Sequence, residues 1–132
     1  MSGPLDRQDP VAVARRYIEL RWTYTWTDRA GVLAAETARA VTTPSFAARS
    51  VPTELAVDGV LQAQDSVTVT VTAAGIDGEM PATPTSCYVD VAFTRTETFR
   101  GSPGPHPDPS FWQLRLVLFG DGWYVDGVEN GQ

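Results

Sequence analysis

Arg95 and Glu97 are the ionisable residues whose types and spacing could do chemistry in this sequence. They stand two positions apart in residues 87–100, where apolar and polar residues alternate as in a β-strand. Residues two apart on a strand share a face, so the two charges should lie side by side. A guanidinium beside a carboxylate keeps the carboxylate ionised. The pattern therefore favours an ion pair at an open rim of the protein over a catalytic acid or base.

The alternative, catalytic interpretation adds two tyrosines to this pair. Tyr17 and Tyr24 would join Arg95 and Glu97 around the mouth of a ligand cavity, where burial can tune a pKa for acid–base work. Arg115 could reach the same face from the next strand. The sequence favours a protein that is not an enzyme. If the protein is an enzyme, these residues are its expected site.

The remaining reactive side chains do not form a catalytic or metal-binding set. Cys87 is the single cysteine and begins an apolar run, so we expect it to pack in the core. His106 is the single histidine and lies among prolines, where an exposed loop position is expected. No second histidine or paired cysteine gives metal-ligand spacing, and no phosphate or dinucleotide motif is found. We expect no metal and no cofactor.

Charge and hydropathy exclude two further classes. The 132 residues carry a net charge of −6, and all ten basic residues are arginines scattered along the chain. A basic stripe for nucleic acid is therefore not expected. No run of 18 apolar residues is present. We expect a disordered or cloning-derived leader over residues 1–9 and one cone-shaped α+β domain over residues 10–132. The protein is expected to be cytoplasmic or to have lost an N-terminal membrane anchor.

The first third of the chain predicts helices. Asp9 and Pro10 are typical of a helix start, and apolar residues at helical spacing continue to Trp26, which would place Trp22 and Trp26 on one face. A second helix is predicted over residues 29–41. A third, over residues 45–50, should be capped by Thr43 and Pro44.

The rest of the chain predicts an antiparallel sheet of about four strands. Strands are expected over residues 66–73, 87–100, 111–119 and 123–129, with an edge strand placed within residues 54–64. Residues 101–109 hold four prolines and two glycines and are predicted to be a loop, and residues 120–122 a tight turn. Three helices followed by a curved sheet give an α+β fold in which the helices cover one sheet face.

The strand over residues 111–119 predicts self-association. Trp112, Leu114, Leu116 and Leu118 share one face, which the helices can cover. Gln113, Arg115, Val117 and Phe119 share the other, which no element of the chain remains to cover. Because that face is only half apolar, we expect a weak homo-oligomer.

The order of elements resembles the cone-shaped nuclear transport factor 2-like, or cystatin-like, superfold. Within it, the patches "DPVAVARRYIELRWTYTWTD" and "VTTPSFAAR" are most similar to the extracytoplasmic domains of TcpC-family conjugation proteins of Gram-positive bacteria. The layout also resembles the mycobacterial cell-entry (Mce)-associated proteins. The TcpC resemblance implies a non-catalytic scaffold of a type IV secretion channel, which contacts other channel subunits and is held at the extracytoplasmic face of the membrane by an anchor.

The same superfold also contains dehydratases, isomerases, cyclases and epoxide hydrolases, so the fold by itself does not separate scaffold from enzyme. The interior of the cone does separate them. A deep polar cavity between the first helix and the sheet would favour an enzyme or small-molecule binder. A cone filled by Trp22, Trp26, Phe46 and Phe93 would favour the scaffold.

Overall fold

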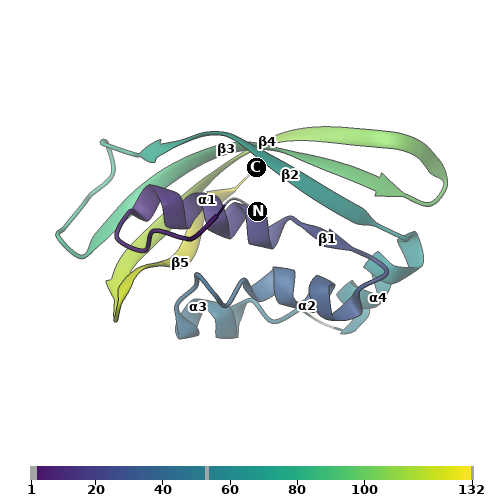
Figure 1. Ribbon diagram of the computed structural model, residues 1–132, viewed down its shortest axis with the longest axis horizontal. Coiled ribbons are helices and arrows are strands. Elements are labelled where there is room, and N and C mark those ends of the chain that lie inside the picture. The colour runs from purple at the N-terminus through teal and green to yellow at the C-terminus, as the bar shows by residue number, and fades with distance from the viewer. Residues whose placement is uncertain (1–2, 53, 132) are drawn as a thin grey trace.

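A computed structural model describes residues 3–52 and 54–131 and shows a curled antiparallel sheet with helices on its concave side (Figure 1). The elements are α1 (Pro10–Arg21), β1 (Tyr24–Thr25), α2 (Arg29–Thr37), α3 (Pro44–Arg49), α4 (Glu54–Ala63), β2 (Ser66–Ile76), β3 (Ser86–Phe99), β4 (Ser102–Phe119) and β5 (Gly122–Gly131). The strands follow one another in the order β1-β2-β3-β4-β5. The α+β prediction is confirmed, with four helices and five strands in the described residues instead of three and about four.

Helix α1 begins as predicted but ends earlier. The Asp9 carboxylate accepts a hydrogen bond from the Val11 amide at 3.0 Å, and Pro10 opens the helix. The helix stops at Arg21, so the prediction that it continues to Trp26 is wrong. Tyr24 and Thr25 instead pair with β2, because alternating threonine and aromatic residues favour an extended backbone. Trp22 and Trp26 therefore do not share a helix face.

The next two helices lie where the sequence predicts them. Helix α2 ends at Thr37, four residues early, because Ala38 adopts a left-handed conformation with φ of 43°. Thr43 caps α3 by accepting a hydrogen bond from the Phe46 amide at 3.2 Å.

Residues 54–64 form a fourth helix, α4, so the edge strand predicted there is wrong. Val57 is buried in α4, and the helix ends where Gln64 turns left-handed with φ of 53°. The Asp65 amide then donates back to the Val60 carbonyl at 3.1 Å, which closes the helix and directs the chain into β2.

Residues 102–109 belong to strand β4, so the predicted loop is also wrong. Prolines 103, 105, 107 and 109 fall at alternate positions along the strand. Backbone groups of alternate residues face the same edge, and here that edge faces away from β3. The pairing of β5 with β4 reaches only to Trp112, so no neighbouring strand of the described residues needs the missing proline N–H groups. The predicted turn between β4 and β5 is confirmed, since Phe119 pairs with Gly122.

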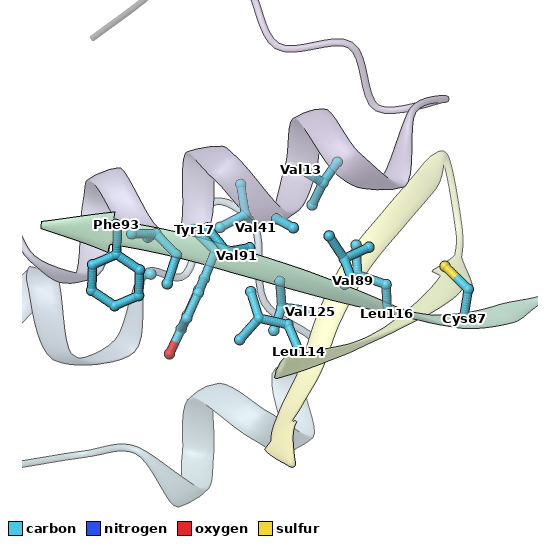
Figure 2. Packing of buried hydrophobic residues seen from close by; sticks show 13 residues of the cluster. Val13, Tyr17, Val41, Cys87, Val89, Val91, Phe93, Leu114, Leu116 and Val125 are labelled. Carbon is cyan, nitrogen blue, oxygen red and sulfur yellow. The ribbon is translucent and has the colours of Figure 1, made fainter. Parts of the chain in front are cut away.

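The core lies between α1 and the concave face of the sheet (Figure 2). Val89, Val91 and Leu114 are fully buried there, and Cys87 is 5% exposed, as predicted for the apolar face of residues 87–93. Trp26 is not in this cluster, whereas Trp22 and Phe46 pack against it.

The two lateral edges of the sheet differ. Along β5, the Trp123 amide donates to the Arg7 carbonyl, and Val125 exchanges backbone hydrogen bonds with Val41 and Thr43. The predicted leader is described from residue 3, and Leu5 within it packs against the core. Along β2, by contrast, β1 pairs only with Ser66 and Val67. No helix among the described residues has the length and hydropathy to cross a membrane.

Candidate functional site

Charged and aromatic side chains gather at the end of the concave face where α1 ends. We call this group the rim cluster: Arg21, Trp22, Tyr24, Asp65, Arg95 and Glu97. The sheet register builds it, because Tyr24 of β1 and Glu97 of β3 both stand opposite Val67 of β2. The structure thus brings together three of the four residues of the catalytic alternative, Tyr24, Arg95 and Glu97.

Asp65 and Glu97 form a carboxyl pair within the rim cluster. Asp65 precedes β2 and lies diagonally across from Glu97, within reach of its side chain. A hydrogen bond between two carboxyl groups would require a proton on one of them. Burial, the hydrogen bond with Glu97 and the charge of Glu97 raise the pKa of Asp65 to about 7. Asp65 Oδ1 is buried and has no hydrogen-bond partner among the described residues.

The Tyr24 hydroxyl is held protonated beside this pair. Burial raises its pKa to about 12, the charge of Asp65 adds to that rise, and Arg21 opposes it. A neutral phenol can donate a hydrogen bond to a bound oxygen, and a carboxyl group with a pKa of about 7 can exchange a proton near neutral pH.

Tyr17 lies in the core rather than at the rim. It is 3% exposed, its ring packs on Phe46 at 6.0 Å between centroids, and burial raises its pKa to about 12. Figure 2 shows the side chain reaching from α1 past the buried valines of the sheet. The tyrosine therefore contributes packing and not a rim hydroxyl.

Arg95 does not pair with Glu97 among the described residues, so the predicted ion pair is wrong. It pairs with Asp108, directly opposite on β4, and stacks over the Trp22 ring at 4.3 Å. Arg21 stacks on the same ring at 4.0 Å. The sequence pattern missed Asp108 because it stands in the proline-rich segment, and missed Asp65 because it lies in the turn before β2.

His106 and Cys87 do not assemble a catalytic or metal site. His106 lies in β4, not in a loop, where its Nε2 is 2.9 Å from Ser102 Oγ and its ring stacks on Phe99. Burial raises the pKa of the Cys87 thiol, which keeps it protonated and unreactive. Among the described residues, no three metal-ligating side chains come together.

The predicted interface residues lie on the convex face of the sheet, and two of them have polar partners. The Gln113 amide donates to Asp77 at 2.9 Å and to Asp90 at 3.1 Å, and Arg115 pairs with Asp126. Val117 is half-buried, and Phe119 is 50% exposed at the β4–β5 turn. Phe111, 43% exposed, is on the same strand. The apolar part of this face is therefore discontinuous.

A separate apolar groove of about 650 Å³ lies on the helical side of the molecule. Its lining comes from the end of α1, from α2 and from the segment before α4. Leu33, Val51 and Pro52 contribute apolar side chains, and Arg39 contributes the charge. Leu33 and Val51 are 37% and 61% exposed, which is high for large apolar residues. This groove was not predicted from the sequence, because it depends on how α2 and residues 51–52 pack beside the end of α1.

Comparisons with known proteins identify no family for this chain. No protein-family model matches the chain, and no curated protein matches it. Among solved structures, the chain is similar to the intermembrane space region of the chloroplast protein ARC6. The identity is 11%, the TM-score is 0.46, and the match covers 96% of this chain and 97% of that one.

Proposed function

We propose that this chain is a non-catalytic assembly domain and, from its resemblance to TcpC-family proteins, a subunit of a conjugative type IV secretion channel. In this proposal it acts at the extracytoplasmic face of the membrane, held by an anchor, and contacts other channel subunits. The observation that carries the proposal is where the apolar residues lie. The interior is filled, and large apolar side chains are exposed on outer surfaces instead.

The filled interior argues against a substrate chamber between α1 and the sheet. Ile18, Phe93 and Leu114 are at most 2% exposed there, and Trp112 packs edge-on against Phe93 at 5.9 Å. The exposed apolar residues Leu33 and Val51 line the groove beside α2, outside that core. An apolar surface of this kind is typical of protein–protein contact.

The groove gives a direct test with a matched control. Leu33→Glu should weaken binding of a neighbouring channel subunit at least tenfold, because a charge would enter the groove. Ala30→Glu adds the same charge to an exposed position of α2 outside the groove and should leave binding unchanged. The partners to test are the proteins encoded beside this gene. Their binding to the purified domain is measured by calorimetry. A gene with no conjugation ATPase or channel subunit nearby would contradict the proposal.

A second candidate function rests on the rim cluster. A small-molecule binder or an enzyme of the isomerase, dehydratase or cyclase type could use Asp65 as the group that exchanges a proton and Tyr24 as the hydrogen-bond donor. This assignment replaces Tyr17 of the sequence-based set with Asp65.

Nuclear magnetic resonance distinguishes this candidate. Adding a panel of small carbonyl and epoxide compounds should shift the amide signals of Tyr24, Asp65 and Glu97, and Asp65→Asn should abolish the shifts. A panel that leaves these signals unmoved would contradict a ligand site at the rim.

A further inference from the structure

Strand β2 leaves a long stretch of backbone without a neighbour. Strand β1 ends its pairing at Val67, so from Thr68 to Ile76 no strand of the described residues lies on the outer side of β2. Among the described residues, no backbone hydrogen bond forms on the outer side of residues 68–76 either. The opposite edge of the sheet is covered along β5 by Arg7 and by residues 41–43.

The hydrogen-bond phase shows which backbone groups face outward. The Asp77 amide donates to the Tyr88 carbonyl at 2.9 Å, so residue 77 faces β3, and the next residue back, Ile76, faces outward. Every second residue along a strand faces the same way, and the bulge between Val71 and Ala73 shifts this alternation once. The backbone groups of Ala74, Val71 and Val69 therefore also face outward. The same alternation predicts that the backbone of Val67 faces outward. This agrees with the pairing of Val67 with Tyr24 of β1.

The side chains along this edge do nothing to prevent strand addition. Natural edge strands are protected by charged residues, proline, shortness, a covering element or a bulge, and of the features within the strand itself β2 has only the bulge between Val71 and Ala73. Residues 68–76 read TVTVTAAGI, with no charge and no proline over nine positions. Thr68 and Thr70 are exposed on the convex face, and threonine and valine favour pairing.

We propose that a second copy of this chain pairs its β2 with this edge, antiparallel, across a two-fold axis between Thr72 and Ala73, where outward-facing residues of the two copies meet. Two five-stranded sheets then form one continuous sheet. Because β1 occupies Ser66 and Val67, pairing begins at Val69, which stands opposite Ile76 of the second copy, and Val71 stands opposite Ala74. This inference goes beyond the proposed function, because it depends on the sheet edge alone.

A second copy fits this edge because the outward-facing residues 69, 71, 74 and 76 match themselves in an antiparallel pair and carry no charge. Each chain carries −6, so most surfaces of two copies repel each other. The β2 edge is uncharged over residues 68–76, and the two-fold arrangement places no like charges opposite each other within the paired strands. One strand pair of about 30 Å, at about 3.3 Å per residue, is small for an interface. The dimer should therefore depend on concentration.

Backbone chemistry provides the test. Sedimentation velocity from about 1 to 500 µM should show a monomer that becomes a dimer. Val69→Pro removes an outward N–H and should raise the dimer Kd at least tenfold, since symmetry removes the bond twice. Val69→Ala loses the same side-chain packing and keeps the N–H, so it should change Kd no more than about threefold. Circular dichroism shows whether each variant folds.

Amide hydrogen exchange gives an independent measurement on the unmodified chain. The amides of Val69, Val71 and Ala74 should exchange rapidly at low concentration and at least tenfold more slowly at high concentration. A monomer at every concentration would overturn the proposal and leave the edge to a strand of another protein. So would a dimer that Phe119→Glu dissociates and Val69→Pro does not, because that result would place the contact on the convex face.

Discussion

The carboxyl pair shows how far single residues can be assigned from sequence. Alternation in residues 87–100 predicted that Arg95 and Glu97 share a face and pair with each other, but each has a different partner. Asp65 and Asp108 take those roles, and each comes from a segment whose backbone was predicted wrongly or left unassigned. A face can be read from alternation, whereas a contact between strands requires the register.

Asp65 should make stability depend on pH in a defined direction. The pKa of its carboxyl is about 7 in the folded chain against an ordinary value of 3.8. Below pH 3.8 both states hold the proton. As pH rises toward 7, the unfolded chain releases its proton first, so the free energy of unfolding falls, and above pH 7 it levels. Asp65→Asn should therefore stabilise the protein at pH 8 by about 1 kcal/mol, allowing for solvent screening, and have little effect at pH 4.

Chemical denaturation at pH 4, 6 and 8 measures this dependence. Glu129→Gln, which neutralises an exposed carboxyl on β5, serves as the control and should show no such trend. An Asp65→Asn variant less stable than the parent at pH 8 would mean that the carboxylate is stabilised by a positive charge and not strained by Glu97.

Gln64 offers a second residue-scale prediction. It holds a positive φ of 53° at the end of α4, a conformation that favours glycine. Gln64→Gly should stabilise the chain by about 1 kcal/mol in thermal or urea unfolding. Gln62→Gly, the same change inside α4, should destabilise it by about 1 kcal/mol, because helical backbone disfavours glycine. Two changes of the same sign would contradict the left-handed turn.

At the scale of elements, the sequence failed where local composition and long-range pairing conflict. The apolar spacing before Trp26 is compatible with a helix, yet β2 offers Tyr24 a strand partner. Four prolines are typical of a loop, yet their alternate spacing fits the open edge of β4. Where the local pattern and the tertiary position agree, as at Asp9, Thr43 and the β4–β5 turn, the elements were predicted correctly.

Thr43 joins two elements, and its hydroxyl should matter more than its methyl group. It caps α3 and also donates to Asp126 Oδ1 on β5 at 2.7 Å. Thr43→Ala should cost about 1–2 kcal/mol in urea unfolding, because it removes the cap and leaves a half-buried carboxylate with one partner fewer. Thr43→Ser keeps the hydroxyl and should cost less than half as much. Equal losses would assign the effect to packing of the methyl group.

The packing of α1 on the sheet gives a prediction about the core. Phe93 is 2% exposed under α1, whereas Phe111, on the neighbouring strand, is 43% exposed. Phe93→Ala should cost about 3–5 kcal/mol of unfolding free energy, and Phe111→Ala less than about 1 kcal/mol. Similar losses at both positions would mean that the concave face is assigned wrongly.

At the scale of the whole molecule, the fold class followed from the sequence because one-sided apolar alternation requires a covered sheet face. Val89, Val91 and Phe93 are buried as that argument demands. The groove beside α2 was not predicted, because it depends on how the helices pack against one another. Of the rim cluster, only Tyr24, Arg95 and Glu97 were predicted as a set, because the other members join through the sheet register and the end of α1.

Net charge makes a prediction at this scale. Two chains of charge −6 that meet through an uncharged edge should associate more tightly as salt screens their repulsion. Raising sodium chloride from about 20 to 200 mM should lower the dimer Kd severalfold in sedimentation equilibrium. Weaker association at higher salt would indicate ion pairs across the contact.

The alternating prolines of β4 bear on how large such an assembly can grow. A sheet with two open edges can add chains without limit and form a fibre. In the described residues, the outer edge of β4 over residues 102–109 has no N–H at its four prolines, and β5 is covered by Arg7 and residues 41–43. Growth can therefore proceed from β2 alone. Once two copies have met there, the assembly is closed, and the same chemistry that permits a pair prevents an amyloid-like polymer.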